Sequence, residues 1–552
     1  MNINFRGQRL IPGYDFLQSQ SDNKPIKVLV HEFIQSVVFT PFPQDNELQV
    51  ERLILAGNIY EGIGFKRKAA FYRRFAALKL VTVQSDWQAC YDSLLSSLEG
   101  FGLTLDPVEY ENSLKDRCGS VWPGLHVQLI EEMITCCKKI QTSQAGTLAI
   151  RHMSFMLHTL DFYLSPSKKR DTARDLEEAS TVYGEDSPVP LKLRNGHVIP
   201  TVNLTKYPLC LKIEPQPLPL PLRPVRLLSL RRRSTLSSSK QMTTQDNPFI
   251  FTPITNHSSM SVFETSQRTS SNSLLSDVVW VQDEACITKM LLLNTLPFEL
   301  NITSIKLLTD GVPIDSKATG IRMEADPNLQ VSVSLVGIPR HILRSSDDSA
   351  ELCSTNRLEI FGYSTHLLGV KSNCRLDAMP QTRLLSKIAV DVCPSLPKLE
   401  YQLSSETTGC FEIEHIPVDQ VDENLVVLEA RVELQRGEDL DAQLTILNSS
   451  NVHLQYIFVK QKLLQNGKRI SLSDDVIRID EELLEKISVS ALKAGDKLNV
   501  PMKIRTNGLV GELESVTVLL EFEYSGGLAL EEMYCRKNSI SVTIDFKEQP
   551  QG

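Results

Sequence analysis

The amino-acid sequence predicts an α + β multidomain protein with three kinds of segment: an N-terminal α-solenoid of TPR-like helical hairpins, a disordered linker rich in proline and serine, and two tandem immunoglobulin-like β-sandwiches. Apolar residues recur at helical spacing in the first part of the chain and at a spacing of two after Val278. The 552 residues are also too many for one hydrophobic core. We therefore expect the solenoid at 1–165, the linker at 166–276, and the sandwiches at 277–395 and 396–548.

The first helical hairpin is predicted between Gln49 and Leu80. Apolar residues follow helical spacing up to Glu61, the glycines of "EGIGF" suit a tight turn, and the spacing resumes at Lys66. The tetratricopeptide pattern fits in part, because Arg73 stands where an aromatic residue is expected. The residues expected to face the core are Val50, Leu53, Ile54, Ile59, Tyr60, Ala69, Ala70, Phe71, Phe75 and Leu78.

A second hairpin is predicted from "VWPGLHVQLIEEMITCCKKI" and "TLAIRHMSFMLHTLDFYL", which the turn "QTSQAG" separates. Stacked hairpins bury faces that none could bury alone, and this stabilises α-solenoids. The stretch "VHEFIQSVVF" looks like an earlier helix, so we expect the chain to begin within a solenoid.

The predicted linker begins near Ser165. Alternating Pro217, Pro219 and Pro221 disfavour a helix and favour polyproline II, and a tract rich in serine and threonine follows. Such a composition cannot bury enough apolar surface to offset the entropy of ordering, so we expect most of 166–276 to be disordered.

The two sandwiches are predicted from strands with alternating apolar residues, such as "LQVSVSLVGIP" in the first set and "SVTVLLEFEYSGG" in the second. A weak internal repeat supports two similar domains. "LLNTLPFELNI" (Leu292–Ile302) and "ILNSSNVHLQY" (Ile446–Tyr456) share a strand that ends in asparagine, a short turn, and a leucine near the start of the next strand. Neither domain has the Cys–Trp–Cys pattern of antibody domains.

Composition excludes several classes of protein. The net charge of −9 argues against nucleic acid as the main partner, and no apolar run approaches the roughly 20 residues that span a bilayer. The start of the chain shows no signal peptide. The 11 cysteines are scattered without a CxxC motif, so we expect reduced thiols in a cytosolic protein.

The basic residues Lys66, Arg67, Lys68, Arg73 and Arg74 form the main candidate binding site. They could hold an acidic partner surface, or they could be the solvated face of a structural helix whose long side chains cover apolar neighbours. The Gly-x-Gly in "EGIGFK" lacks the context of a phosphate loop. We hypothesise that the cluster is a partner-facing edge of the hairpin that contacts protein.

We expect no catalytic, cofactor or metal site. His152 and His158 are six residues apart on one helix and lack the i, i+4 spacing of a zinc helix, so they are expected to be core or surface histidines. No HExxH, GxSxG or Walker motif is present, and nothing in the sequence positions a nucleophile. The sequence therefore predicts a protein that is not an enzyme.

The linker carries a candidate regulatory motif. "RRRS" (Arg231–Ser234) resembles a site for basophilic kinases, which makes Ser234 a candidate phosphorylation site. The same basic segment could contact an anionic membrane, at about 1 kcal/mol per Lys or Arg. It is also compatible with an SH3-type ligand, because "PLPLPLRP" is proline-rich and ends near an arginine.

Several of these stretches resemble one family. "LAGNIYEGIGFKRKAAFYRRFAALKLV" and "RHMSFMLHTLDFYLS" resemble helices of the large TRAPP II-specific subunit (transport protein particle complex subunit nine, also called NIK- and IKK-beta-binding protein), and "LLNTLPFELNITSIKLLTDGV" and "FGYSTHLLGVKSNCRLD" resemble its β-rich region. The resemblance covers most of residues 30–530. It matches the central portion of the family. We expect this chain to lack the N-terminal part and the further C-terminal β domains of the family.

The resemblance implies a non-catalytic scaffold or tethering subunit of the TRAPP II complex in ER-to-Golgi and Golgi vesicle transport. Its implied partners are other TRAPP subunits, a Rab GTPase reached indirectly through nucleotide exchange by the core subunits, and kinases of the IKK and NIK type in NF-κB signalling. The implied location is cytoplasmic and peripheral at Golgi and ER–Golgi membranes. The alternative is a coat- or adaptor-like protein in which a sandwich pocket binds cargo peptides.

Overall fold

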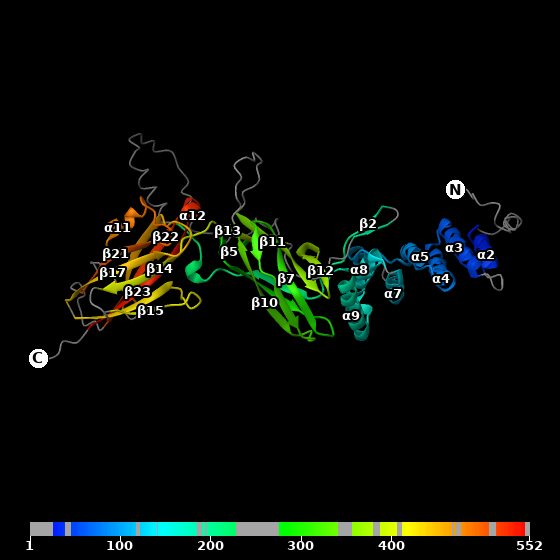
Figure 1. Ribbon diagram of the computed structural model, residues 1–552, viewed down its shortest axis with the longest axis horizontal. Coiled ribbons are helices and arrows are strands. Elements are labelled where there is room, and N and C mark those ends of the chain that lie inside the picture. The colour runs from blue at the N-terminus through cyan, green and yellow to red at the C-terminus, as the bar shows by residue number, and fades with distance from the viewer. Residues whose placement is uncertain are drawn as a thin grey trace, which may run out of the picture.

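Helices and strands follow one another along an elongated molecule. Figure 1 shows the helices at one end, the first β-sandwich in the middle and the second β-sandwich at the other end. The structure is a computed structural model that describes residues 26–38, 46–116, 122–140, 142–184, 190–193, 196–227, 275–340, 356–378, 387–405, 411–435, 437–465, 468–470, 476–506 and 515–546.

The N-terminal part consists of α-helices that pack largely in chain order, as the solenoid prediction requires. The predicted hairpins are present: α3 and α4 form the first, and α7 and α8 form the second. The helices are α2 (Ile26–Val38), α3 (Asn46–Gly62), α4 (Lys66–Gln84), α5 (Trp87–Phe101), α6 (Pro107–Asp116), α7 (Pro123–Ile140), α8 (Ser143–Thr159) and α9 (Pro166–Tyr183).

Local sequence signals fix several helix ends. The side chain of Asp86 accepts a hydrogen bond from the Ala89 amide at 2.9 Å, which caps the N-terminus of α5. Ser165 caps α9 in the same way, with proline at the first helical position. Gly64 lies between α3 and α4 with φ of +86°, a conformation that glycine adopts readily, so the predicted glycine turn is confirmed.

The predicted core face of α4 is only partly correct. Ala69 and Ala70 are buried, but Phe71 and Phe75 are 58% and 46% exposed, so the prediction that these two rings face the core is wrong. Leu78 of α4 and Ile54 of α3, which were also predicted to face the core, are exposed as well. The helix carries two apolar stripes, and the one that faces α3 and α5 comprises Ala69, Ala70, Tyr72, Ala76, Ala77 and Leu80.

Small side chains decide which stripe of α4 is buried. A β-carbon on Gly100 of α5 would lie 2.5 Å from the carbonyl oxygen of Lys66, so the two helices approach with their backbones nearly in contact. Alanines permit this close approach and phenylalanines do not. The stripe with four alanines is therefore buried, with Tyr72 stacked on Tyr60 of α3, and the stripe with Phe71 and Phe75 is left on the surface.

The first sandwich contains a four-stranded sheet in the order β3-β6-β10-β8 and a larger sheet in the order β5-β13-β11-β7-β9, with β12 paired to β11. Its strands alternate buried and exposed residues, as predicted for half-buried strands. The bounds are β3 (Leu209–Pro215), β5 (Leu275–Val281), β6 (Cys286–Leu293), β7 (Leu300–Gly311), β8 (Ile314–Ser316), β9 (Thr319–Met323), β10 (Gln330–Pro339), β11 (Arg357–Leu367), β12 (Val370–Arg375) and β13 (Ile388–Cys393).

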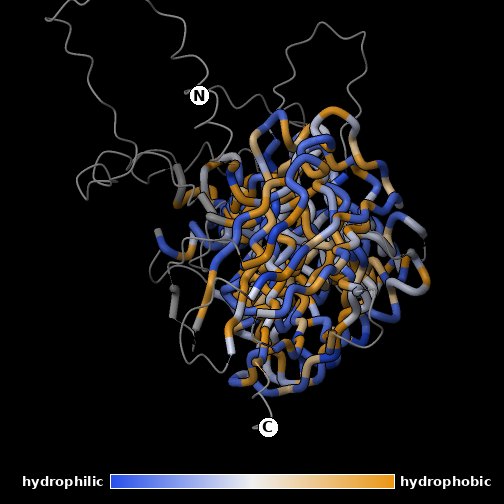
Figure 2. The backbone as a smooth tube through the Cα atoms, turned by 90° about the vertical axis from the view of Figure 1, so that its left-hand side faces the viewer, coloured by the Kyte–Doolittle hydropathy of each residue, from blue (hydrophilic) through white to orange (hydrophobic). Residues whose placement is uncertain are grey.

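The second sandwich pairs a sheet in the order β14-β17-β21-β20 with a sheet in the order β15-β16-β23-β22-β18-β19. Figure 2 looks along the molecule and shows hydrophilic and hydrophobic residues alternating along the chain. The bounds are β14 (Leu399–Ser405), β15 (Phe411–His415), β16 (Val426–Leu434), β17 (Asp439–Asn448), β18 (Tyr456–Gln465), β19 (Lys468–Ile470), β20 (Ile477–Ile479), α11 (Glu481–Lys486), β21 (Lys497–Arg505), β22 (Ser515–Ser525), α12 (Gly527–Glu531) and β23 (Tyr534–Phe546).

The internal repeat corresponds to a buried asparagine in each sandwich. Asn294 follows β6 and Asn448 ends β17, and both are about 1% exposed or less. The Asn294 amide donates to the Phe298 carbonyl at 3.0 Å, and the Asn448 amide donates to the Val452 carbonyl at 2.9 Å. Each asparagine therefore holds the turn that follows its strand, because a buried amide requires such partners.

The segment 196–227, which we call the strap, lies within the predicted disordered linker but is folded onto both sandwiches. Its strand β3 pairs with β6 in the first sandwich, and β4 (Val225–Arg226) pairs with β23 in the second. Between them Leu218 is only 3% exposed. The alternating prolines favour an extended chain, which suits a segment that crosses from one sandwich to the next.

The helix α9 also occupies part of the predicted linker. Its sequence is highly charged, and it buries only a narrow stripe that includes Ala173 and Leu176. Composition alone therefore did not reveal it. The remaining linker prediction, including Ser234 and the "RRRS" motif, falls on residues 228–274, which lie outside the described residues.

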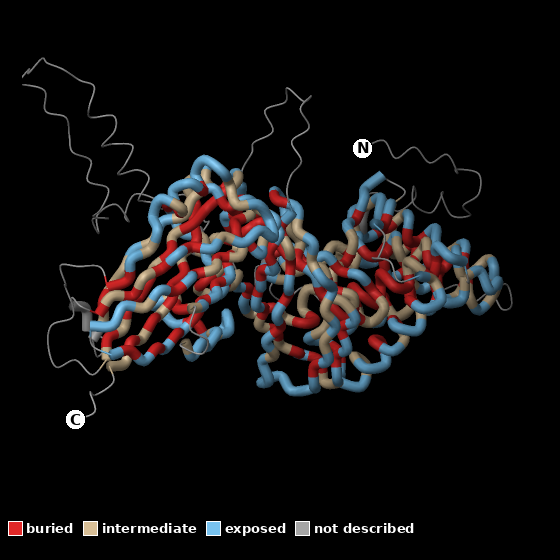
Figure 3. The backbone as a smooth tube through the Cα atoms, turned by 60° about the vertical axis from the view of Figure 1, so that its left-hand side comes forward, coloured by how far each residue is buried: buried red, intermediate tan, exposed pale blue. Residues whose placement is uncertain are grey.

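One hydrophobic core runs from the helices into the first sandwich. Buried residues of α5, α7, α8 and α9 belong to the same contiguous cluster as those of the first sandwich, and the second sandwich has a separate core. Figure 3 shows the buried residues continuing through these parts. Among the described helices, none is long and apolar enough to cross a membrane.

We predict that trypsin leaves the strap uncut under native conditions. Lys212 lies in β3, which pairs with β6, and Arg226 lies in β4 with its guanidinium 4.0 Å from the ring centre of Tyr534, so cleavage after either residue would require local unfolding. Mass spectrometry of a digestion time course would identify the cut sites, and the same digestion in urea is the control. Early native cuts after Lys212 or Arg226 would show that the strap is not docked. Early cuts within 228–274 would support the disorder predicted there.

Candidate functional site

The predicted basic site lies on α4, and its arginines connect neighbouring helices. The Nη2 and Nε atoms of Arg74 donate to the two carboxylate oxygens of Glu132 in α7, at 2.6 and 3.0 Å. Arg73 forms an ion pair with Glu61 of α3 and donates to the Asn58 side chain at 3.2 Å. Bidentate arginine–carboxylate pairs fix geometry as well as charge. These two arginines therefore link α4 to α3 and α7.

The other members of the cluster also have partners within the chain. Lys66 pairs with Glu99 of α5 at 2.7 Å, and this contact raises the pKa of Lys66 and lowers that of Glu99. The Arg67 guanidinium lies 4.8 Å from the ring centre of Trp122, and the Lys68 ammonium lies 5.5 Å from that of Tyr60. All five basic residues therefore have a charged or aromatic neighbour within the chain. Binding of a partner by Lys66, Arg67, Lys68, Arg73 and Arg74 stays a prediction.

An exposed apolar stripe lies on α4 among these basic residues. The rings of Phe71 and Phe75 stack with their centres 6.4 Å apart, and Leu78 continues the stripe one turn further. Trp122 is 59% exposed, and the Arg67 guanidinium lies over its ring, so we count Trp122 with this stripe. We call Phe71, Phe75, Leu78 and Trp122 the α4 surface. Sequence reasoning assigned these phenylalanines to the core because it could not tell which of two apolar stripes meets a neighbouring helix.

The helical part is fixed to the first sandwich by buried polar contacts. The Tyr207 hydroxyl of the strap donates to the Leu157 carbonyl of α8 at 3.1 Å, and the His158 ring lies 2.8 Å from the Thr205 hydroxyl. Burial lowers the pKa of His158 to about 3, so its ring is neutral at pH 7. A β-carbon on Gly369 would clash with Ser180 of α9 at 1.6 Å. These contacts pack the helices directly against the strap and the first sandwich.

The two sandwiches meet around Arg536, which is fully buried. Its guanidinium donates to the Glu284 carboxylate at 2.5 Å and to the carbonyls of Leu396 and Pro397 at 3.3 and 3.1 Å. Its Nε donates to the Leu222 carbonyl of the strap at 3.2 Å. One side chain from β23 thereby joins the first sandwich, the strap and the connection between the sandwiches.

The histidines have structural partners. The His152 ring lies 3.0 Å from the Tyr91 hydroxyl, and burial lowers its pKa to about 3. His126 lies between the Tyr110 hydroxyl at 2.9 Å and the Phe101 carbonyl at 3.0 Å. Within the described ranges no group of three or more His, Cys, Asp or Glu side chains could hold a metal ion.

Stacked helical hairpins that continue into immunoglobulin-like sandwiches define a class of extended, multidomain proteins built around contact surfaces. Within it, residues 216–341 match a family model described as "Trs120/TRAPPC9, first Ig-like domain". This match starts inside the strap, which agrees with its place in the first sandwich.

Curated relatives match nearly the whole chain. Trafficking protein particle complex subunit 9 of Xenopus laevis is 31% identical over 565 residues, and the proteins of the same name from Mus musculus and Homo sapiens are 27% identical over 566 and 572 residues. Each alignment covers 94% of this chain and 45% of the relative. The chain is therefore a relative of trafficking protein particle complex subunit 9, which confirms the resemblance. It spans about half the length of the curated relatives it matches.

Solved structures align with this chain at low TM-scores. The PapD-like domain 7 of human CEP192 aligns with 27% of this chain at 10% identity, with a TM-score of 0.17. A value this low supports no conclusion about function.

Proposed function

We propose that this chain is a non-catalytic scaffold segment of a trafficking protein particle (TRAPP) complex. The names of its relatives support a role as a complex subunit. The stiff junctions support a scaffold, because the strap and Arg536 hold helices and sandwiches in one arrangement. A scaffold of this kind presents surfaces at fixed spacing and needs no reacting groups.

The more specific part of the proposal comes from the family resemblance. The complex is TRAPP II, and its process is vesicle tethering in ER-to-Golgi and Golgi transport. In this proposal the core subunits carry out Rab nucleotide exchange and this chain supports them from the cytoplasmic side of the membrane. A link to NF-κB signalling through kinases of the IKK and NIK type belongs to the same proposal.

The observation that carries the proposal is the α4 surface. Stacked Phe71 and Phe75 rings remain exposed beside Arg67 and Arg74, and aromatic residues with arginine are enriched at the centres of protein–protein interfaces. A rim of basic residues would mainly steer association with an acidic partner. We assign to this surface the contact with another TRAPP subunit.

We expect the double substitution Phe71→Asp, Phe75→Asp to weaken association with the other TRAPP subunits at least ten-fold, because it places charges at the centre of the contact. The measurement is affinity purification from cells followed by quantitative mass spectrometry of the subunits. The matched control is Phe162→Asp on the same helical part, since Phe162 is 89% exposed and lies away from α4.

Unchanged association in the Phe71→Asp, Phe75→Asp variant would overturn the assignment of the α4 surface. Loss of association in both variants would point to a general effect of charge instead. As a second measurement, the purified chain should not accelerate nucleotide release from a Rab GTPase. Acceleration by the chain alone would contradict a non-catalytic role.

A further inference from the structure

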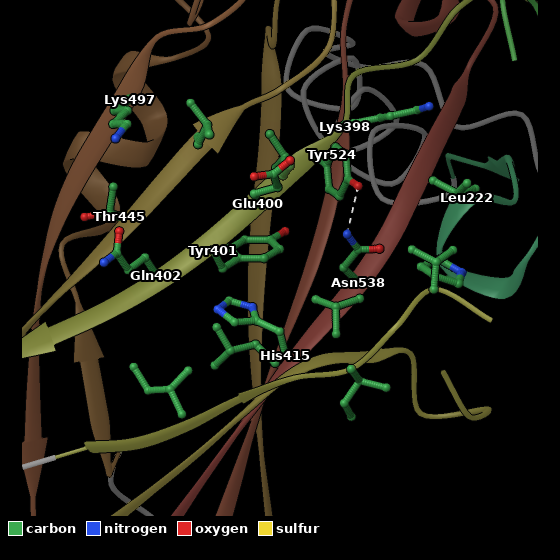
Figure 4. A pocket seen from close by; sticks show the side chains of 18 residues that line it. Leu222, Lys398, Glu400, Tyr401, Gln402, His415, Thr445, Lys497, Tyr524 and Asn538 are labelled. Carbon is green, nitrogen blue, oxygen red and sulfur yellow. Dashed lines mark hydrogen bonds between the residues drawn. The ribbon is translucent and has the colours of Figure 1, made fainter. Parts of the chain in front are cut away.

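A cavity of about 650 Å³ lies beside strand β14 of the second sandwich. Figure 4 shows Tyr401 and Gln402 of β14 on one side of it and His415 of β15 on the other. Strands β14 and β15 are the edge strands of opposite sheets. The cavity therefore lies at an open side of the sandwich.

The cavity exposes an unpaired backbone edge. Within the described residues the only strand neighbour of β14 is β17, and the Ser449 amide donates to the Lys398 carbonyl at 3.0 Å at the start of this pairing. Hydrogen-bonded and non-bonded pairs alternate in an antiparallel ladder. The backbone groups of Glu400 and Gln402 therefore face β17, whereas those of Tyr401 and Leu403 face the open side.

The lining follows the two-residue period of a strand. Tyr401 is buried between the sheets, together with Leu428 of the opposite sheet, and both line the cavity. Glu400 and Gln402 lie on the outer face of the sheet and line the same cavity. The cavity therefore borders both faces of the sheet at its edge, where one more strand would lie.

The hydroxyl of Tyr401 supplies a second, independent observation. Tyr401 is 4% exposed, and its hydroxyl makes no hydrogen bond of good geometry in the described part of the chain, since the nearby Asn538 side chain bonds to Tyr524 instead. The neighbouring hydroxyl of Tyr524 is satisfied by Asn538 at 2.9 Å. A buried hydroxyl without a partner is unfavourable, so a group that enters the cavity and bonds to it would be favoured.

The opposite wall is apolar and accessible. Ile413 of β15 is 37% exposed and Val418 is 46% exposed, and both line the cavity. The Ile416 amide donates to the Val427 carbonyl at 3.1 Å, which holds this wall in place. An apolar side chain from an incoming strand would cover these residues.

We propose that the β14 edge binds an extended peptide segment of a partner protein as an added strand. Backbone hydrogen bonds to Tyr401 and Leu403 would supply affinity, and alternate apolar side chains would enter the cavity towards Tyr401 and Val418. Glu400 is exposed and forms no ion pair among the described residues, so a lysine or arginine on the outward side of the peptide would pair with it. The peptide is thus an alternating apolar and basic segment. This binding does not depend on assembly into a TRAPP complex.

The test uses the full chain and a fluorescent nine-residue peptide of sequence SVKVTVKVS, measured by fluorescence anisotropy. The peptide should bind more tightly, by at least ten-fold, than a peptide of the same composition without alternation, VVVVTKKSS. N-methylation of alternate residues is the decisive probe, because it removes backbone donors from one edge of a strand at a time. Methylation of the residues whose amides face β14 should abolish binding of the peptide. Methylation of the alternate residues, whose amides face away from β14, should change the affinity less than about three-fold.

Protein variants locate the site. Val418→Asp should weaken binding of the peptide at least ten-fold, whereas Val489→Asp should change it less than two-fold, since Val489 is 90% exposed and does not line the cavity. Tyr401→Phe should not lower the unfolding midpoint, because it removes a buried hydroxyl that forms no hydrogen bond of good geometry within the described chain, and it should weaken binding of the peptide several-fold.

Three results would overturn the proposal: equal binding of both peptides, equal loss from both methylation phases, or unchanged binding by the Val418→Asp variant. A second copy of the chain is the other candidate occupant of this edge. A dimer in sedimentation velocity that the Val418→Asp variant dissociates would assign the edge to self-association and reject the peptide.

Discussion

Replacing Arg536 with methionine should destabilise the second sandwich and its junction by about 3–5 kcal/mol. Methionine keeps much of the length of the side chain but removes every donor. Glu284, which is 7% exposed, would then keep only Lys398 at 3.3 Å, and the carbonyls of Leu396 and Pro397 would lose their donor. Chemical denaturation of the full chain, followed by tryptophan fluorescence and by circular dichroism, measures the change.

Arg431→Met is the matched control, because Arg431 pairs with Asp545 on the surface of the same sandwich at 3.5 Å and is 65% exposed. Exposed pairs of this kind contribute about 1 kcal/mol or less. Adding Glu284→Leu to the Arg536→Met variant should recover part of the loss, since it removes the buried carboxylate that has lost Arg536. If both arginine variants lose the same small amount, Arg536 does not hold the junction.

The role of Arg536 could not be predicted from the sequence. It lies in the stretch "YCRKN", where an arginine next to a lysine is typical of a solvated strand face. Its partners come from positions more than a hundred residues away. The guanidinium of Arg536 is buried because the two sandwiches contact each other there, and sequence periodicity does not encode that contact.

Periodicity predicted the elements well and their contacts less well. The helical spacing of Gln49–Leu80 predicted α3 and α4 correctly, because that pattern depends only on local geometry. Which stripe of α4 is buried depends on its packing against Gly100 and α3, so the positions of Phe71 and Phe75 were predicted wrongly.

The strap shows a different limit of sequence reasoning. The prolines at 217, 219 and 221 predicted an extended chain without a helix, but Leu220–Leu222, which contains Pro221, forms a short 3-10 helix. Composition also could not show that apolar residues such as Leu218 meet a surface. The prediction of disorder rests on the composition of the segment alone. The surface that buries the strap is supplied by β6 and β23, far along the chain.

The β14 edge could not be predicted either. Strand "LEYQLSS" alternates like any half-buried strand, and nothing local distinguishes an edge strand from a central one. Strand order, which places β14 at one margin and β15 at another, is a property of the whole fold. The basic cluster on α4 was found from the sequence, but its pairing with Glu61, Glu99 and Glu132 was not.

Tyr60→Ala should destabilise the N-terminal helices by about 3–5 kcal/mol. Tyr60 is fully buried between α2, α3 and α4, where its ring stacks on Tyr72 with the ring centres 5.3 Å apart. Its hydroxyl lies 2.5 Å from the Nδ1 atom of His31, so the substitution also leaves that histidine without this partner. The core around it is small, and little else can fill the cavity that the ring leaves behind.

Phe75→Ala is the control for this change, since Phe75 lies on the same helical hairpin but is 46% exposed. We expect it to alter the free energy of unfolding by less than about 0.5 kcal/mol, as surface substitutions usually do. Thermal and urea unfolding of the full chain, monitored by helical circular dichroism, gives both values under the same conditions. A large loss from Phe75→Ala would return that ring to the core and remove the α4 surface as a binding site. A small loss from Tyr60→Ala would mean that the first hairpin is held by contacts other than this aromatic core.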